Sequence, residues 1–322
     1  MPRAFSQPDS PSALPGAAET RHGSEWGLHA TWHWRGQACH WRRLGGLHQP
    51  PLVLLHGFGA GSGHWRRNAA VLADAGWCVY SLDLLGFGAS SQVPLRLDNR
   101  LWARQLEAFL REVVQGPAVL VGHSLGGLVA LTCGVFFPQV VRAVVAAPLP
   151  DPTLLLADPQ APPAGAPPRR PWRRRLQRFV VTWLCRLLPL EVLVPLLAHS
   201  PLLDLGIQAA YRDPVIGDDE LHRLIARPAR RAGAVRALRA MSIAMALRPH
   251  GATAPALLRR LRHPCLLLWG GDDRLVPLDV GLQCRRLRPD LALEVIDQAG
   301  HCPHDERPDA FHRVLIPWLE RL

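Results

Sequence analysis

The segment 121–127, Val-Gly-His-Ser-Leu-Gly-Gly, constrains the fold of this chain more than any other. It joins an apolar run at 118–121 to a helix-compatible run at 128–131. A strand, a Gly-x-Ser-x-Gly turn and a helix in this order are the setting of a nucleophile elbow. The glycines two residues before and after the serine are needed because a Cβ there would collide with the neighbouring strand or helix. We therefore expect Ser124 at the carboxyl end of a sheet and at a helix N-terminus, where developing negative charge is stabilised.

Strands and helices alternate on both sides of this turn. Further strands are expected at 51–55, 77–83, 140–146, 265–269 and 291–296. The helices that accompany them are expected at 63–75, 98–114, 128–137, 278–287 and 308–322. Repeated strand–helix units predict an α/β fold with a doubly wound, mostly parallel sheet. Aromatic and polar residues alternate at 26–43, which predicts an additional hairpin.

Between residues 148 and 260 this alternation stops. The segment 161–171 is rich in proline and is expected to be a loop. Helical stretches are expected at 172–188, 190–199, 218–225 and 229–246. We therefore expect a helical cap inserted at 148–260, with the α/β core formed by 26–147 and 261–322.

The composition sets further limits. The 322-residue chain has a formal net charge of +11, and all 37 of its basic residues are arginine. Its 7 cysteines are scattered, without a Cys-x-x-Cys pair, which favours reduced thiols in the cytosol over a disulfide framework. Neither a zinc-finger spacing nor an aromatic RNA-binding motif is present, so no nucleic acid partner is expected. Residues 1–25 are rich in Pro, Ser and Ala, lack the features of a signal peptide, and are expected to form a disordered tail.

An arginine cluster within the expected cap has two interpretations. It flanks Trp172 and consists of Arg169, Arg170, Arg173, Arg174, Arg175 and Arg178. A basic stretch that contains tryptophan can lie on an anionic membrane surface, and it can equally form the solvated face of a cap helix. The region 179–205 is very apolar, but charged residues and prolines interrupt it too often for a transmembrane span. We therefore expect a cytoplasmic protein, with peripheral attachment to a membrane as the alternative.

Two residues later in the chain complement Ser124. A serine hydroxyl becomes a nucleophile only beside a general base, and the base needs an acid that orients it. Asp273 follows the strand expected at 265–269, and His301 follows the strand expected at 291–296. Both residues therefore fall at the carboxyl edge of the sheet, beside Ser124. The order Ser, Asp, His along the chain is one that accompanies a nucleophile elbow.

The acid in this set has alternatives. Asp272 is adjacent to Asp273 and competes with it, although an aspartate at this place is more ordinarily a turn residue. Asp151 lies just beyond the strand expected at 140–146, where some enzymes with such an elbow place the acid. The sequence favours Asp273 and leaves the other two open.

Two backbone N–H groups are candidates for holding a negatively charged oxygen. One belongs to Leu125, the residue after Ser124. The other belongs to the loop His56-Gly57-Phe58-Gly59, and the N–H of Phe58 is favoured. Such a donor typically contributes a factor of about 10²–10³ in rate. His56 itself is expected to be structural.

The segment 301–304, His-Cys-Pro-His, has residue types that bind metals. No matching pair of ligands is evident elsewhere in the sequence, so we expect no metal and no other cofactor. His304 and Asp305 are instead expected to help cap the last helix.

Together these motifs resemble the α/β-hydrolase superfamily. They are, in chain order, the segments 56–59, 83–90, 122–127, 269–277 and 300–301. The resemblance covers about residues 27–150 and 262–322. It implies that the helical insertion is a cap that shapes the substrate pocket, and that Asp83 is a structural residue.

A narrower resemblance is carried by the segments 59–68 and 300–308, which read Gly-Ala-Gly-Ser-Gly-His-Trp-Arg-Arg-Asn and Gly-His-Cys-Pro-His-Asp-Glu-Arg-Pro. They resemble a cyanobacterial and plastid branch that includes pheophytinase-like and dephytylase-like esterases. The chain departs from that branch at His123, where much of the branch has Asn, and in its arginine-rich cap.

These resemblances imply a serine hydrolase that cleaves an ester-like bond of a hydrophobic small molecule through Ser124, His301 and Asp273. The same residues can serve C–C bond hydrolysis, perhydrolysis or acyl transfer, and the same fold can serve as a non-catalytic binding module. Epoxide hydrolase and haloalkane dehalogenase chemistry is disfavoured because those enzymes use an aspartate as the nucleophile.

Overall fold

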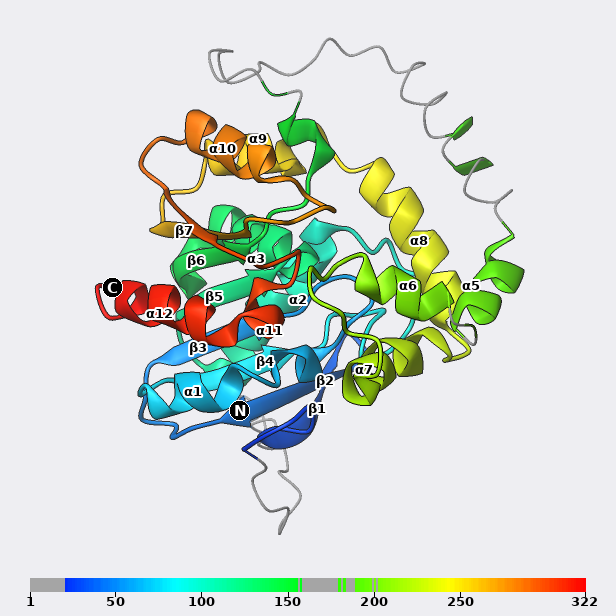
Figure 1. Cartoon of the computed structure of the whole chain (residues 1–322), viewed down its shortest axis with the longest axis horizontal. Helices are drawn as coiled ribbons and strands as arrows, with labels where there is room; N and C mark the ends of the chain where they lie inside the picture. Colours follow the sequence, from blue (N-terminus) through cyan, green and yellow to red (C-terminus); the bar gives the residue numbers. More distant parts are fainter. Residues whose placement is uncertain are drawn as a thin grey trace, which may run out of the picture.

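The computed structural model describes residues 21–155, 157, 179–180, 182–183, 189–198, 200 and 202–322. Within them an eight-stranded sheet has the order β1-β2-β4-β3-β5-β6-β7-β8 (Figure 1). The strands are β1 (Leu28–Trp34), β2 (Gln37–Leu44), β3 (Pro51–Leu55), β4 (Cys78–Leu82), β5 (Ala118–His123), β6 (Val141–Ala147), β7 (Cys265–Gly270) and β8 (Ala292–Ile296). Neighbouring strands from β4 to β8 are parallel, whereas β2 is antiparallel to both β1 and β4. The predicted doubly wound, mostly parallel α/β sheet is therefore confirmed.

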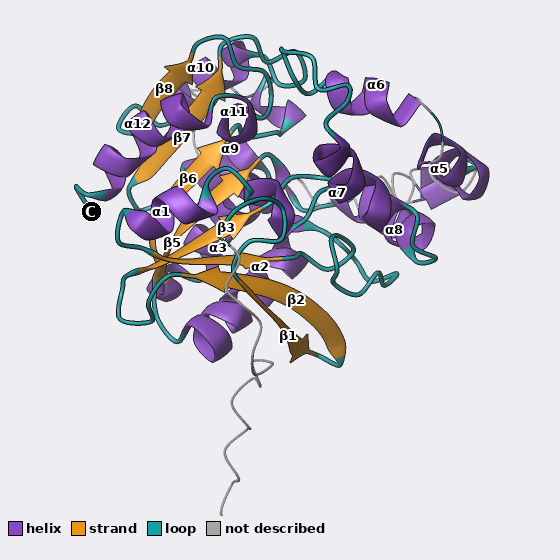
Figure 2. Cartoon of the chain, turned by 60° about the horizontal axis from the view of Figure 1, so that its bottom comes forward, coloured by secondary structure: helices purple, strands orange, loops and turns teal. Residues whose placement is uncertain are grey.

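Helices cover both faces of this sheet (Figures 1 and 2). The covering helices are α1 (Ala69–Asp74), α2 (Asn99–Phe109), α3 (Leu125–Phe136), α9 (Ala254–Leu258), α10 (Leu278–Leu287) and α12 (Pro308–Leu319). Helices α1 and α12 share one apolar core with the sheet, and α2, α3, α9 and α10 share the other. Strand β5 lies between the two cores, because Val119 and Val121 belong to the first and Ala118 and Leu120 to the second. Burial on both faces explains why this strand is a continuous apolar run.

Among the described residues, four further α-helices lie between β6 and α9 along the chain. They are α5 (Leu190–Ala198), α6 (Leu202–Gln208), α7 (Asp219–Ala229) and α8 (Ala234–Ala246). They lie together at one side of the molecule, outside the layers that cover the sheet (Figures 1 and 2). The arginine cluster at 169–178, most of the helix expected at 172–188 and the tail residues 1–20 lie outside the described residues.

Several predicted helices have different bounds in the structure. The helix expected at 63–75 is instead a 3-10 helix, η1 (Ser62–Trp65), followed separately by α1. Between them the buried Asn68 bonds His304 O and the ring of His312, so tertiary contacts turn the chain here. The helix expected at 98–114 is α2, capped by the Asp98 side chain, and its last turn is π-helical. The helix expected at 229–246 begins only at Ala234, because α7 runs on to Ala229.

The described residues bear on two expectations, one about disulfide bonds and one about membrane-spanning helices. The six cysteines among them form no disulfide. Across the same part of the chain, every helix is too short or too polar to cross a lipid bilayer.

Candidate active site

Ser124 stands in a strained turn between β5 and α3. Its φ of +51° and ψ of −114° place it in a region that residues with a side chain rarely adopt. A Cβ on Gly122 would lie 2.3 Å from the backbone of Gly126, and a Cβ on Gly126 would lie 2.2 Å from Leu55 O. The two glycines are therefore required by close backbone approach on each side of the serine. The Ser124 N–H donates to Ala147 O at 3.1 Å, which ties the turn to the end of β6.

A chain of hydrogen bonds joins Ser124, His301 and Asp273. His301 Nε2 lies 2.9 Å from Ser124 Oγ, and His301 Nδ1 lies 2.9 Å from Asp273 Oδ2. All three residues are buried. A carboxylate can only accept, so His301 Nδ1 carries the proton and Nε2 is left to accept from the serine hydroxyl. The other oxygen of Asp273 accepts from the N–H groups of Leu275 and Val276, each at 2.9 Å, which fixes the carboxylate.

The structure places the two alternative acids away from this chain. The Asp272 side chain is 49% exposed and pairs with Arg212 Nε at 2.8 Å. Asp151 is buried, pairs with Arg248 and accepts from the backbone N–H groups of Thr153 and Ala254. Asp151 therefore joins the chain after β6 to the start of α9, and among the three aspartates only Asp273 bonds His301.

The two predicted N–H donors belong to segments that adjoin Ser124. Leu125 is the first residue of α3, and the first N–H groups of a helix have no acceptor within it. Phe58 follows Gly57, whose added Cβ would lie 3.4 Å from Ser124 Cβ. The loop after β3 therefore passes beside the serine. The Phe58 side chain is 57% exposed and packs edge-on against Phe87, with ring centroids 5.7 Å apart.

Two further polar residues near this loop have structural contacts. His56 Nε2 accepts from the Leu84 N–H at 3.1 Å, and burial lowers the pKa of this histidine. Asp83 accepts from the N–H groups of Ser62 at 2.6 Å and Ala89 at 2.8 Å, and its Oδ2 lies 3.1 Å from His40 Nδ1. Burial alone would raise the pKa of Asp83, but the bond from His40 and nearby positive charge hold it well below its usual range.

The loop that carries His301 is tied to the connection between α6 and α7. The His301 N–H donates to Ala210 O at 2.8 Å. Glu306 accepts from the N–H groups of Arg212 and Asp213, each at 2.7 Å, and from the Gly300 N–H. Sequence reasoning gave Glu306 no role of its own, because its partners are backbone groups that carry no sequence signal.

The prediction that Asp305 caps the last helix is wrong. Helix α12 has Arg307 at its N-cap position and no side-chain cap bond. Asp305 is buried and accepts from Arg66 through both carboxylate oxygens, each at 3.0 Å, and from the Tyr211 hydroxyl at 3.0 Å. Arg66 also binds Asp218 on the chain just before α7. Both Arg66 and Asp305 stand in the segments that carry the pheophytinase-like resemblance, and that is the signal that could have singled them out.

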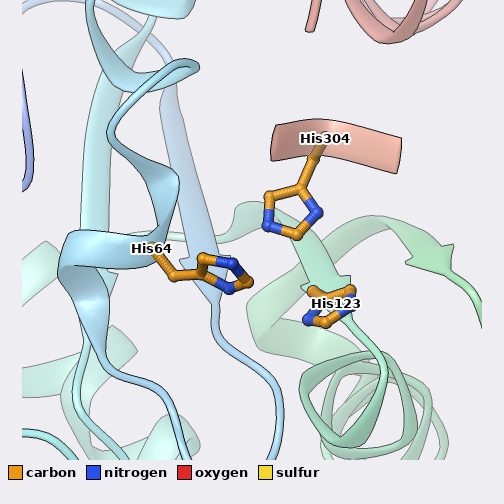
Figure 3. A group of neighbouring side chains, drawn as sticks. All are labelled: His64, His123 and His304. Carbon is orange, nitrogen blue, oxygen red and sulfur yellow. The ribbon is translucent and has the colours of Figure 1, made fainter. Parts of the chain in front are cut away.

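His304 does not cap the last helix either. It lies in α11 (Pro303–Glu306), beside His64 of η1 and His123 at the end of β5 (Figure 3). The expectation that no matching pair of potential metal ligands stands elsewhere in the chain is therefore wrong. His64 and His123 are 59 residues apart in the sequence, and only the folded chain brings them next to His304.

An apolar cavity of about 240 Å³ opens between the loop after β3 and helices α5 to α8. Its lining includes Phe58, Phe87, Leu97, Ile225, Leu238 and Met241. None of the described residues that line it is charged. The cavity therefore favours an apolar ligand group. Phe58, which is part of its lining, directly follows Gly57, and Gly57 lies against Ser124.

Known proteins are similar to this chain. The family described as alpha/beta hydrolase fold matches residues 50–308. The chain is 25% identical over 284 residues to a 2-hydroxy-6-oxononadienedioate/2-hydroxy-6-oxononatrienedioate hydrolase from Pseudomonas sp, with 84% of this chain and 88% of that protein covered. It is 24% identical over 335 residues to the chloroplastic pheophytinase of Arabidopsis thaliana, with 91% of this chain and 66% of that protein covered.

Solved structures have the same fold. A thermophilic esterase from Thermogutta terrifontis superimposes with a TM-score of 0.65 at 22% identity, over 91% of this chain and 98% of that one. The family match runs from β3 to the start of α12 and so includes the elbow, the Asp273 turn and the His301 loop. The distant match to pheophytinase supports the narrower resemblance. The chain therefore belongs to the α/β-hydrolase family.

Proposed function

We propose that this hydrolase cleaves an ester-like bond of a hydrophobic small molecule, with Ser124 as the nucleophile. The observation that carries this proposal is the position of His301, whose two ring nitrogens lie 2.9 Å from Ser124 Oγ and 2.9 Å from Asp273 Oδ2. This is the geometry in which a histidine can take a proton from serine while an aspartate holds its ring in the correct tautomer.

In the proposed reaction, Ser124 Oγ attacks the substrate carbonyl as its proton passes to His301 Nε2. Asp273 stabilises the imidazolium, and the N–H groups of Leu125 and Phe58 hold the oxyanion. The imidazolium then protonates the leaving alcohol, and an acyl-enzyme remains. Water activated by His301 releases the acyl group and restores the serine.

The apolar cavity supports a neutral, hydrophobic substrate group. A dioate, such as those in the names of the curated relatives, carries two carboxylates, and their burial would call for a cationic partner. The described lining of the cavity has no charged side chain. We therefore propose a substrate with a hydrophobic acyl or alcohol group in place of a dicarboxylate.

Labelling with a fluorophosphonate probe tests the nucleophile. Wild-type protein is expected to label, and Ser124→Ala is expected to lose the label completely. Ser242→Ala is the matched control, because this serine lies on α8 and bonds Leu238 O. A folded wild type that does not label would contradict the proposal and favour a binding module. An ester panel of increasing chain length then measures the preference for apolar groups.

C–C bond hydrolysis is a second candidate, and the names of the curated relatives favour it. It uses the same three side chains, as perhydrolysis and acyl transfer also can. Product analysis separates these reactions, because an ester yields an alcohol and an acid whereas C–C cleavage of a diketone-like substrate yields no alcohol. Turnover of a vinylogous diketone without ester hydrolysis would replace the first proposal by the second.

We also propose that this protein attaches peripherally to an anionic membrane surface. The side chains of Val192, Leu196, Leu202 and Leu205 on α5 and α6 are each more than half exposed. They follow the arginine cluster at 169–178 in the sequence, and an apolar face beside basic residues suits an anionic bilayer. Sedimentation with liposomes, with and without anionic lipid, tests this proposal. Absence of salt-sensitive binding to the anionic vesicles would remove it.

A further inference from the structure

Three buried histidines from distant parts of the chain lie together (Figure 3), and the ring of one of them, His123, lies 5.2 Å from that of His301. The His304 ring centroid lies 4.5 Å from that of His123 and 4.7 Å from that of His64. A ring nitrogen from each residue lies within 4.8 Å of one from each of the others. None of the three has a part in the proposed hydrolysis, so the cluster needs its own explanation.

The hydrogen bond of His123 determines its tautomer. Its Nε2 lies 3.0 Å from the His301 carbonyl oxygen, which can only accept, so Nε2 carries the proton. Its Nδ1 therefore has a free lone pair, and this buried atom has no hydrogen-bond partner in the described part of the chain. A Cβ on Gly57 would lie 2.5 Å from this nitrogen, so the glycine leaves room beside it.

The tautomer of His64 follows from the hydrogen bonds of the Tyr211 hydroxyl. Its Nε2 lies 2.9 Å from the Tyr211 hydroxyl, which donates its only proton to Asp305 at 3.0 Å. The hydroxyl oxygen must then accept from His64, so His64 Nε2 carries the proton. Its Nδ1 has a free lone pair and, like that of His123, no partner among the described residues.

His304 completes the set. Neither of its ring nitrogens has a hydrogen-bond partner within the described residues, although the side chain is fully buried. In either neutral tautomer it offers one lone pair. Burial lowers the pKa of all three histidines, that of His64 to about 4, so the neutral, metal-binding forms prevail at neutral pH. Buried nitrogens without partners are costly, and a bound ion or water is one way in which native proteins satisfy them.

We propose that His64, His123 and His304 bind one Zn²⁺ ion through a single nitrogen each. Three neutral imidazoles are a common zinc donor set, and a small non-protein ligand would take the fourth position. The His301 carbonyl and the Tyr211 hydroxyl occupy the outer positions that orient zinc-binding histidines. Zinc–nitrogen bonds of about 2.0–2.1 Å require the three nitrogens to move together by on the order of 1 Å.

The proposed ion is structural, and it stands independently of the proposed hydrolysis. It links the chain after β3 through His64, the elbow through His123 and the His301 loop through His304. His123 directly precedes Ser124, and His304 lies three residues after His301. Zinc would therefore hold the segments of the active site together without contact with substrate.

The test uses the full-length chain without an affinity tag, stripped with a chelator and then titrated with Zn²⁺ or Co²⁺. The expected result is one ion per chain, a rise in Tm with Zn²⁺, and Co²⁺ absorption bands of tetrahedral intensity. His304→Gln is expected to lose all three effects, and His312→Gln to keep them. His312 is the matched control because its buried ring is not one of the three in the cluster; it bonds Asn68, which contacts His304 at the backbone carbonyl.

Two results would overturn the proposal. One is a wild type that binds less than a tenth of an equivalent of Zn²⁺ or Co²⁺ while remaining folded. The other is equal binding by His304→Gln, which would place the ion elsewhere. If His304→Gln fails to fold, His64→Gln replaces it, and the wild-type stoichiometry and Co²⁺ spectrum still decide. Fluorophosphonate labelling of the same samples reports on the hydrolase separately.

Discussion

Arg66 and Asp305 form a buried, bidentate ion pair although they are 239 residues apart in the chain. Arg66 lies between η1 and α1, and Asp305 lies in α11, just after the loop that carries His301. Arg66 also binds Asp218, at the N-cap of α7, and Glu220, in the first turn of α7. One guanidinium thus joins the core, the His301 loop and the helices that border the apolar cavity.

Removal of the Asp305 charge is expected to destabilise the protein strongly. Asp305→Asn removes the most buried of the three carboxylates that bind Arg66 and leaves Asp218 and Glu220 in place. We therefore expect a loss toward the lower end of the about 3–5 kcal/mol that breaking a buried pair typically costs. Urea unfolding should show this loss, and kcat should fall because the His301 loop loses its anchor. Asp290→Asn, at a side chain that is 69% exposed and pairs with Arg288, should cost less than about 1 kcal/mol. Equal losses of stability in the two variants would refute the anchoring role of Asp305.

We expect Asp273, and not its neighbour Asp272, to be the acid that orients His301. Asp273→Asn cannot hold His301 in the same tautomer, and a change of this kind typically lowers kcat by a factor of about 10⁴. Asp272→Asn removes an exposed contact with Arg212 and should change kcat by no more than a few-fold. The measurement is ester hydrolysis by both variants at equal folded concentration. A larger loss in Asp272→Asn would reverse the assignment.

Gly126, two residues after the serine, is expected to tolerate no side chain. In Gly126→Ala the new Cβ would lie 2.2 Å from Leu55 O, and the backbone is held by α3 at Gly126 and by β3 at Leu55. We expect a loss of about 3 kcal/mol or more in the free energy of unfolding, or no folded protein. Gly116→Ala is the control, because no atom lies within 4 Å of its added Cβ. A stable Gly126→Ala variant would mean that the turn is less tight than described.

Acidification is expected to destabilise the metal-free protein between about pH 6.5 and pH 4. The folded-state pKa values of His64, His123 and His304 lie below the ordinary value of 6.5, and that of His64 is about 4. In this window the unfolded chain binds more protons than the folded chain, so stability falls as the pH falls. Each histidine contributes at most roughly a kcal/mol per pH unit.

Urea unfolding in the presence of a chelator, at pH 7.5, 6 and 5, measures this slope. His304→Gln should show a shallower dependence on pH, because one of the buried neutral imidazoles is gone. A wild-type free energy of unfolding that stays constant from pH 7.5 to pH 5 would contradict the neutral state of the cluster.

The sequence by itself determined the α/β sheet, the hairpin of β1 and β2, and the strained turn at Ser124. These features depend on local rules: apolar runs form buried strands, and a turn this sharp excludes Cβ atoms at Gly122 and Gly126. The same rules placed Asp273 and His301 at one edge of the sheet, because both follow predicted parallel strands.

Only the tertiary structure decided which loop residues meet. In the folded chain Asp273 bonds His301, whereas Asp272 pairs with Arg212. Asp305 binds Arg66 and does not cap a helix. His304 lies beside His64 and His123. These contacts join polar side chains on different loops, and the spacing of residues along the chain does not report the direction in which a loop points. Burial then selects among the possible partners, because a buried polar group without a partner is costly, and this selection exists only once the chain has folded.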